Sequence, residues 1–435
     1  MESAHRTIEL VARSAYGRLV AYLSAQTRDV ASAEDALGEA LVEALASWPR
    51  NGVPEKPEAW LLTAARHRLV DQERRMRTQE RHEAALRSLV VEPEGVEGAD
   101  ELPDERLKLF FVCAHPAIDP ALHAPLMLQA VLGLDAARIA PAFLLSPAAM
   151  SQRLVRAKTK IREAAIPFEV PDQRELPRRL DSVLEAIYAA YGLGTDGISG
   201  ADPSARELAE EAVWLARVLA QRMPEEPEMD GLLALLLFCE SRRLARRTAR
   251  GEYVPLSEQD PAAWSESVIL EAEARLSAAA SRGKHDGRFQ LEAAIQSVHA
   301  DRRKTGRTDW AAIALFYDHL ARLAPTVGAL VGRAVATAEV RGPGAGLAVL
   351  EGIGSSVVSS YQPYWAVRAH LLKSLGRVDE ASEAYDLAIG LTKDDAARRF
   401  LLGRRAGFDA GGEPSVVPRN SRIPVEGREG STPSS

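Results

Sequence analysis

The sequence predicts an all-α fold. Alanine and leucine dominate, aromatic residues make up only 6% of the 435 residues, and apolar positions recur over long stretches at the spacing of amphipathic helices. The chain is too long for one compact core, which indicates two to four domains. A hydrophobic content of 46% with 26% charged residues is ordinary for a globular protein, and the formal net charge is -7.

The cysteines and the N-terminus predict a cytoplasmic protein. Cys113 and Cys239 lie far apart in the sequence, so we expect no disulfide framework and a reducing compartment. The N-terminus carries Glu2 and has no apolar segment of the signal-peptide type. The most apolar run, "GLLALLLFC" at 231–239, is about half as long as a bilayer-spanning helix. We therefore expect no contact with a membrane.

Residues 1–89 are expected to form three helices, at roughly 6–26, 30–48 and 56–87. The second helix has one apolar face and one acidic face, the latter formed by Glu34, Asp35, Glu39 and Glu43. Pro49 and Gly52 then interrupt the chain. The third helix carries an aromatic residue, Trp60, and a set of basic residues, Arg66, Arg68, Arg74 and Arg75. An acidic helix is thus followed closely by a basic one.

An acidic segment separates these helices from the next group. The stretch "VVEPEGVEGADELPDE" at 90–105 is rich in glycine and proline and shows no periodicity, which is typical of a flexible linker, here assigned to 90–103. Residues 104–170 follow as four shorter helices. The apolar helix "LHAPLMLQAVLG" is expected to end at Gly133. Pro141 should kink or shorten the next helix, "LDAARIAPAFLL".

The stretch "SPAAMSQRLVRAKTKIR" at 146–162 concentrates positive charge on one short helix. Ser146 can cap its first turn, and Pro147 suits the first helical position. An apolar stripe faces away from the charge and consists of Met150, Leu154, Ala157 and Ile161. Two short helices with a tight turn and a basic second helix match a helix-turn-helix, in which the second helix enters the major groove.

The chemistry of this helix suits DNA. Gln152 can pair with adenine and Arg153 with guanine, while Lys158 or Lys160 can neutralise phosphates. A basic helix alone is more often only a solvated surface, and any helical hairpin can imitate a helix-turn-helix. The presence of a second basic helix around Trp60, beyond an acidic linker, favours DNA binding.

Residues 171–406 contain helix pairs of similar length, set off by the three prolines of "IPFEVPDQRELP" at 166–177. The clearest pair, within 363–406, has small and aromatic residues where tetratricopeptide helices pack, namely Trp365, Ala369, Leu372, Gly376, Ala381, Tyr385 and Ala388. Such pairs usually build a concave surface for a peptide or a protein domain. Residues 407–435 have a composition that cannot bury a core, so we expect a disordered tail.

We find no motif of an enzyme or of a cofactor or metal site. "CAHP" at 113–116 offers one cysteine and one histidine, but no second pair follows at zinc-finger spacing, so a core cysteine is the better interpretation of Cys113. Neither a Ser-His-Asp set, an HExxH motif nor a Walker loop stands out.

The sequence resembles bacterial RNA polymerase sigma factors of the sigma-70 family, and more narrowly the extracytoplasmic-function branch with a long helical C-terminal extension. The resemblance covers about residues 10–405. It is carried by "YGRLVAYLSAQTRDVASAEDALGEALVEALASWPRNGVPEKPEAWLLTAARHRLVDQERR" in the first segment and by "CAHPAI", "MSQRLVRAKTKI" and "IPFEVP" in the second. In the extension, "QLEAAIQSVHA" and "DWAAIALFYDHL" are also similar.

The resemblance implies an N-terminal sigma domain at 1–89, a C-terminal sigma domain at 104–170 and a tetratricopeptide-like extension at 171–406. Its implied partners are core RNA polymerase and promoter DNA. The residues implied to dock on polymerase are Glu34, Asp35, Glu39 and Glu43. Those implied to recognise the −10 element are Trp60, Arg66, Arg68, Arg74 and Arg75. Those implied to read the −35 element are Ser146, Ala149, Met150, Gln152, Arg153, Arg156, Lys158 and Lys160.

Alternatives remain open at this point. The chain could be a helical-repeat scaffold for protein interactions whose sigma-like front no longer binds DNA, or a repressor that binds duplex DNA without polymerase. The extension could also regulate the factor in cis, by an intramolecular contact that masks the sigma domains or by stabilising the polymerase complex.

Overall fold

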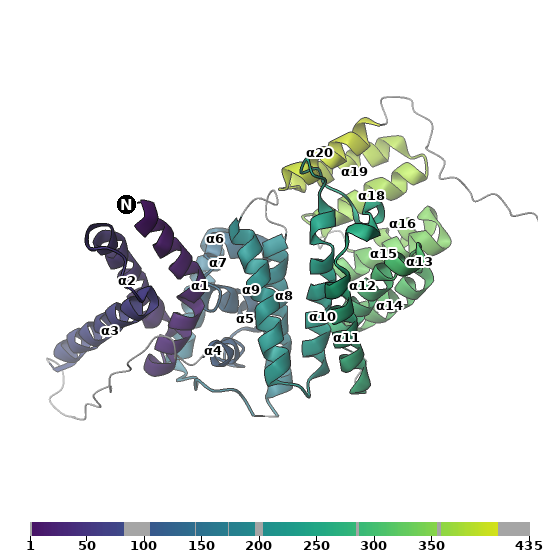
Figure 1. The fold of residues 1–435 in the computed structure, drawn as a ribbon. Helices are drawn as coiled ribbons and strands as arrows, with labels where there is room; N and C mark the ends of the chain where they lie inside the picture. The colour runs from purple at the N-terminus through teal and green to yellow at the C-terminus, as the bar shows by residue number, and fades with distance from the viewer. Residues whose placement is uncertain are drawn as a thin grey trace, which may run out of the picture.

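The computed structural model describes residues 2–81, 105–143, 145–172, 174–195, 203–283, 287–354 and 358–407. The all-α prediction is confirmed: within these ranges the chain forms helices, and its β-type pairing is limited to an isolated bridge between Arg247 and Tyr253. The linker predicted at 90–103 and all but the first residue of the tail predicted at 407–435 lie outside the described residues. In Figure 1 the N-terminal helices and the C-terminal helices lie at opposite ends of the molecule.

The N-terminal unit consists of α1 (Glu2–Thr27), α2 (Val30–Asn51) and α3 (Pro57–Arg81). Asp29 caps α2 by accepting from the amides of Ala31 and Ser32 at 3.0 and 3.2 Å. The helix runs three residues beyond the predicted end at 48, with Pro49 inside it, and stops at Gly52, whose φ of 88° favours glycine. Burial of Trp48 and its edge contact with Trp60, 5.5 Å between ring centroids, tie α2 to α3.

The second unit consists of α4 (Arg106–Cys113), α5 (Pro120–Ala130), α6 (Ala136–Ile139), the 3-10 turn η2 (Ala140–Phe143) and α7 (Pro147–Glu163). Asp119 and Asp135 cap α5 and α6. The expected shortening at Pro141 is observed, because α6 ends at Ile139 and the chain continues as a 3-10 turn. Cys113 is fully buried, in agreement with a core cysteine.

The first two units pack tightly against each other. α1 contacts α4 and α5, and α2 contacts α7. Gly17 of α1 lies so close to the carbonyl oxygen of Val131, at the end of α5, that a Cβ atom there would overlap it. A Cβ atom on Gly133 would also crowd the ring of Tyr16, at 2.8 Å from its nearest carbon. A single cluster of contacting buried residues therefore extends through α1–α7.

The same cluster continues into the C-terminal half, from Ile8 as far as Ala300. α8 (Leu176–Thr195) packs on α5, and His123 of α5 lies 2.9 Å from the hydroxyl of Ser182. Arg106 of α4 pairs with Glu211 of α9 and stacks over Trp214 at 4.4 Å. The C-terminal half thus contacts the second unit directly (Figure 1).

The remaining helices continue the array. They are α9 (Pro203–Arg222), α10 (Pro227–Ser241), α11 (Glu266–Ser281), α12 (Arg288–Ala300), α13 (Arg302–Thr305), α14 (Trp310–Leu323), α15 (Val327–Arg341), α16 (Pro343–Glu351), α18 (Gln362–Ser374), α19 (Val378–Leu391) and α20 (Asp395–Ala406), with 3-10 turns η3 (Arg243–Arg246), η4 (Leu256–Glu258) and η5 (Pro261–Ala263). In the predicted pair α18–α19, Ala369, Leu372, Ala381, Tyr385 and Ala388 are buried. None of the described helices is long and apolar enough to cross a bilayer.

Candidate nucleic-acid interfaces

The first candidate interface is the solvent face of α7. Ser146 caps the helix by accepting from the amide of Ala149 at 3.3 Å, and the apolar stripe expected from the sequence is buried. Met150 belongs to that stripe and is fully buried, so the expectation that it contacts DNA is wrong. Its position on the helix matches the core-facing period rather than the solvent face.

Four predicted DNA-binding side chains lie on the opposite face of α7. Gln152, Arg153, Arg156 and Lys160 are exposed. Among the described residues, no side-chain hydrogen bond or ion pair involves any of the four. The capped helix therefore presents one neutral hydrogen-bonding group and three cations to solvent, with no acidic partner, which is the arrangement that base edges and phosphates require.

One edge of α7 is instead occupied by α2. Lys158 forms an ion pair with Glu34, and both side chains are nearly buried, at 13% and 10% exposed. Arg162 lies 3.6 Å from Asp29. Burial raises the pKa of Glu34, an effect that Lys158 opposes, and the second carboxylate oxygen of Glu34 has no partner within the described ranges. Lys158, which was expected to contact a DNA phosphate, and Glu34, which was expected to dock on polymerase, are thus paired with each other.

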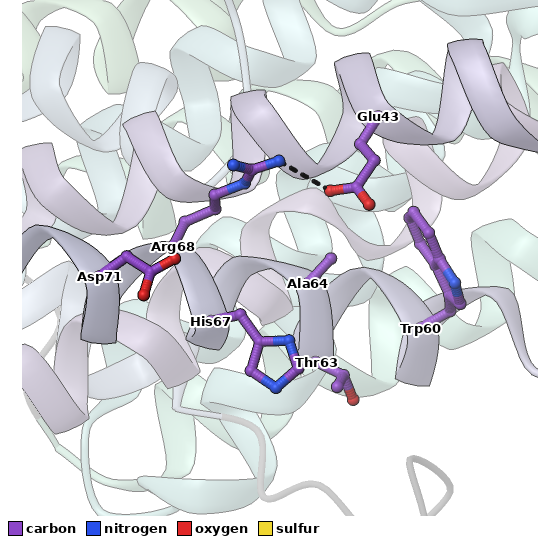
Figure 2. Close-up of a pocket in the computed structure, with 7 residues that line it drawn as sticks. All are labelled: Glu43, Trp60, Thr63, Ala64, His67, Arg68 and Asp71. Atoms are coloured by element: carbon purple, nitrogen blue, oxygen red, sulfur yellow. Dashed lines mark hydrogen bonds and ion pairs between the residues drawn. The ribbon is translucent and has the colours of Figure 1, made fainter.

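The second candidate interface is a pocket on α3 with a volume of about 340 Å³, shown in Figure 2. Its lining comes from α2 and α3 and consists of Glu43, Trp60, Thr63, Ala64, His67, Arg68 and Asp71. Arg68 bridges back to α2, at 2.9 Å from Glu43 and 3.6 Å from Glu39. An indole wall with hydroxyl, imidazole and carboxylate groups around it can stack a flat ring and hydrogen-bond its edge.

The other residues predicted around this pocket differ in their placement. Arg66 turns inward, donates to the hydroxyl of Tyr22 at 2.7 Å and lies over that ring. Arg74 and Asp35 are exposed, whereas the side chain of Arg75 lies outside the described residues. The pocket-lining Thr63, His67 and Asp71 were not predicted. They follow Trp60 at successive spacings of three, four and four residues, and this helical period is the signal that could have identified them.

Comparisons with known proteins agree with the N-terminal assignment. Residues 11–81 match the model of sigma-70 region 2, which spans α1–α3, and residues 179–280 match a family of unknown function, DUF6596. An uncharacterized protein of Rhizobium meliloti (strain 1021) is 39% identical over 403 residues, which cover 91% of this chain and 94% of that protein. No solved structure matches the chain. The chain therefore belongs to the same family as the Rhizobium meliloti protein, and its residues 11–81 are similar to sigma-70 region 2.

Proposed function

We propose that this chain is a sigma factor of the extracytoplasmic-function branch, which directs core RNA polymerase to specific promoters and initiates DNA-templated transcription. The observation that carries the proposal is the solvent face of α7, whose Arg153, Arg156 and Lys160 have no partner among the described residues although the chain is acidic overall. Together with region 2, this face gives the molecule two separate places for promoter DNA.

In this proposal α7 reads the −35 element. Gln152 and Arg153, near the start of the helix, reach base edges, and Arg156 and Lys160 contact phosphates. Ser146 and Ala149 orient the first turn, since the serine cap fixes the helix start. The buried stripe of α7 holds the helix on α5 and α6 so that its solvent face stays in one orientation.

The pocket on α3 takes a base of the −10 element. Trp60 offers the stacking surface, and Thr63, His67 and Asp71 offer hydrogen-bonding groups for the edge of the base. Arg68 and Arg74 hold the strand by charge. Trapping one unstacked base is the step that converts recognition into strand opening, because the base can no longer return to the duplex.

The two interfaces cannot engage both promoter elements in the arrangement described here. Glu34 touches α7 and Glu43 lines the pocket, and the nine helical steps from one residue to the other span about 14 Å. The −10 and −35 elements are about 25 base pairs apart, or about 85 Å. We therefore propose that α7 leaves α2 when polymerase binds. The acidic face of α2, with Asp35 at its exposed edge, then becomes available for docking.

The helical extension is proposed to modulate the factor as part of its fold. It contacts α4 and α5 through Arg106 and His123. A tetratricopeptide-like surface in the C-terminal half would add a protein partner. We expect such a factor to have no enzymatic activity. We expect it to act in the cytoplasm, where polymerase and DNA are located.

Transcription with purified core polymerase tests the proposal. We expect Gln152→Ala/Arg153→Ala to lower initiation from a cognate promoter at least tenfold and to leave polymerase binding unchanged, because α7's solvent face meets only DNA. The matched control Arg399→Ala removes one exposed positive charge from α20 and should initiate like wild type. Loss of polymerase binding in the α7 variant would contradict the assignment of α7.

A further inference from the structure

A buried arginine without a carboxylate partner lies at the end of α10, far from both DNA interfaces. Arg242 is only 7% exposed. Its Nη2 donates to Oε1 of Gln296 at 2.6 Å and lies 3.9 Å from the Sγ of Cys239. Its Nη1 is buried and has no partner, and among the described residues no acidic side chain forms an ion pair with it.

The nearest acid in the sequence is engaged elsewhere. Glu240 accepts from the hydroxyl of Tyr191 at 2.9 Å and pairs with Arg243 at 3.3 Å. Burial lowers the pKa of Arg242, but a guanidinium keeps its proton in proteins. A buried cation of this kind costs several kcal/mol unless a negative charge compensates it. The protein's own described side chains do not supply that charge.

Two further buried donors without a partner belong to segments that pack near Arg242. Nε of Arg302 and Nε1 of Trp264 are both buried without a partner, and the Arg302 guanidinium lies over the Trp264 ring at 4.9 Å. The amide of Ser265 donates to the carbonyl of Ser241 at 2.9 Å, which joins the Trp264 segment to the segment of Arg242.

The charges at this junction influence one another. The pKa of Arg302 is lowered by burial and by Arg242, and the pKa of His299 is lowered to about 4 by burial and by both arginines. His299 is therefore neutral near pH 7, while the two guanidinium groups leave the junction positive.

We propose that this junction, where α10, α13 and the segment 254–264 meet, binds a small oxyanion of the phosphate or sulfate type. Nη1 of Arg242 is the main donor, and Nε of Arg302 and Nε1 of Trp264 are the further donors. A guanidinium matches oxyanions because its planar N–H groups can bond two oxygen atoms at once. Buried water would satisfy single donors but would leave the charge of Arg242 uncompensated.

Direct binding to the full chain tests this proposal. Equilibrium dialysis with labelled phosphate and labelled sulfate, at constant ionic strength set with chloride, should give saturable binding of one oxyanion per chain. Thermal melting in the same buffers should show stabilisation by phosphate or sulfate beyond that by chloride, since a ligand that binds the folded state raises Tm. Absence of saturable binding of either oxyanion would overturn the proposal and leave water as the occupant.

A charge-supplying variant makes the test specific. Gln296→Glu is nearly isosteric and places a carboxylate where the amide oxygen now lies 2.6 Å from Arg242. We expect it to fold and to lose at least tenfold in oxyanion affinity, because Arg242 gains an internal counterion. The matched control Gln221→Glu makes the same change at an exposed position of α9 and should bind like wild type. Unchanged affinity in Gln296→Glu would overturn the proposed site.

Discussion

Substitution of Gly17 by alanine should force the N-terminal unit away from the second unit, α4–α7. A Cβ at this position would lie far inside the 3.0 Å that real Cβ contacts keep from the carbonyl oxygen of Val131. Neither side can yield locally, because the obstacle is a backbone carbonyl and Tyr16 is held against Gly133. Overpacking in a well-packed core destabilises a protein by up to about 3 kcal/mol. Alanine offsets about 1 kcal/mol of this, because it favours the helix more than glycine does.

The net cost of about 2 kcal/mol corresponds to about thirtyfold more frequent opening of the contact. Cys113 reports the opening, because it is fully buried and lies near enough to Glu34 and Lys158 for both to influence its pKa, which burial raises. We expect a thiol reagent to label Cys113 about thirtyfold faster in Gly17→Ala than in wild type. Peptide mass spectrometry separates this signal from that of Cys239.

The matched control is Gly38→Ala in α2, where a Cβ would meet nothing within 4 Å. It should label at the wild-type rate or more slowly, since the helix gains stability without a clash. Equal labelling of Cys113 in Gly17→Ala and Gly38→Ala would refute the reasoning that the two units are held together at Gly17.

Three further predictions concern the contacts that carry the account. Lys158→Met should destabilise the α2–α7 contact by about 3 kcal/mol because Glu34 loses its cation. The pKa of Glu34 is already raised, so this loss of stability should grow as pH rises above the usual carboxyl range and Glu34 ionises. It should shrink at pH 5, where more of Glu34 is protonated. Calorimetry should show this, and Glu34→Gln/Lys158→Met should recover most of the loss. Arg162→Met, at 59% exposure, should cost under about 1 kcal/mol in the same assay. Trp60→Ala should abolish strand opening, followed by permanganate footprinting, while polymerase binding persists. Leu184→Ala should lower stability by about 2–5 kcal/mol because α8 is buried against α5. An unchanged melting curve would mean that the extension is an independent unit.

Local patterns in the sequence predicted most of the helices and much of α7. The Ser146 cap, the buried stripe and the exposed Arg153 follow from the helical period and from the chemistry of the first turn. The error at Met150 arose because a residue of the apolar stripe was also counted as a DNA contact. The pocket residue His67 was missed although it shares the helical spacing of Trp60.

The long-range pairing could not be predicted in this way. Lys158 and Glu34 are 124 residues apart, and each belongs to a charged face that, considered alone, indicates an external partner. The packing of α1 on α4 and α5, together with the contact of α2 with α7, brings these faces together. The lack of a carboxylate partner for Arg242 among the described residues is likewise a property of the folded chain, since Glu240, two residues away in the sequence, is paired with Tyr191 and Arg243 instead.

Initiation by core RNA polymerase on fragmented genomic DNA of the encoding organism shows whether the chain acts as a sigma factor. With the transcript 5′ ends sequenced, the wild-type chain should produce start sites that share two upstream motifs, and core polymerase alone should not. Gln152→Ala/Arg153→Ala should lose the starts that depend on the upstream motif and keep its affinity for polymerase. A wild-type chain that binds no core polymerase, or that adds no start sites, would contradict the account.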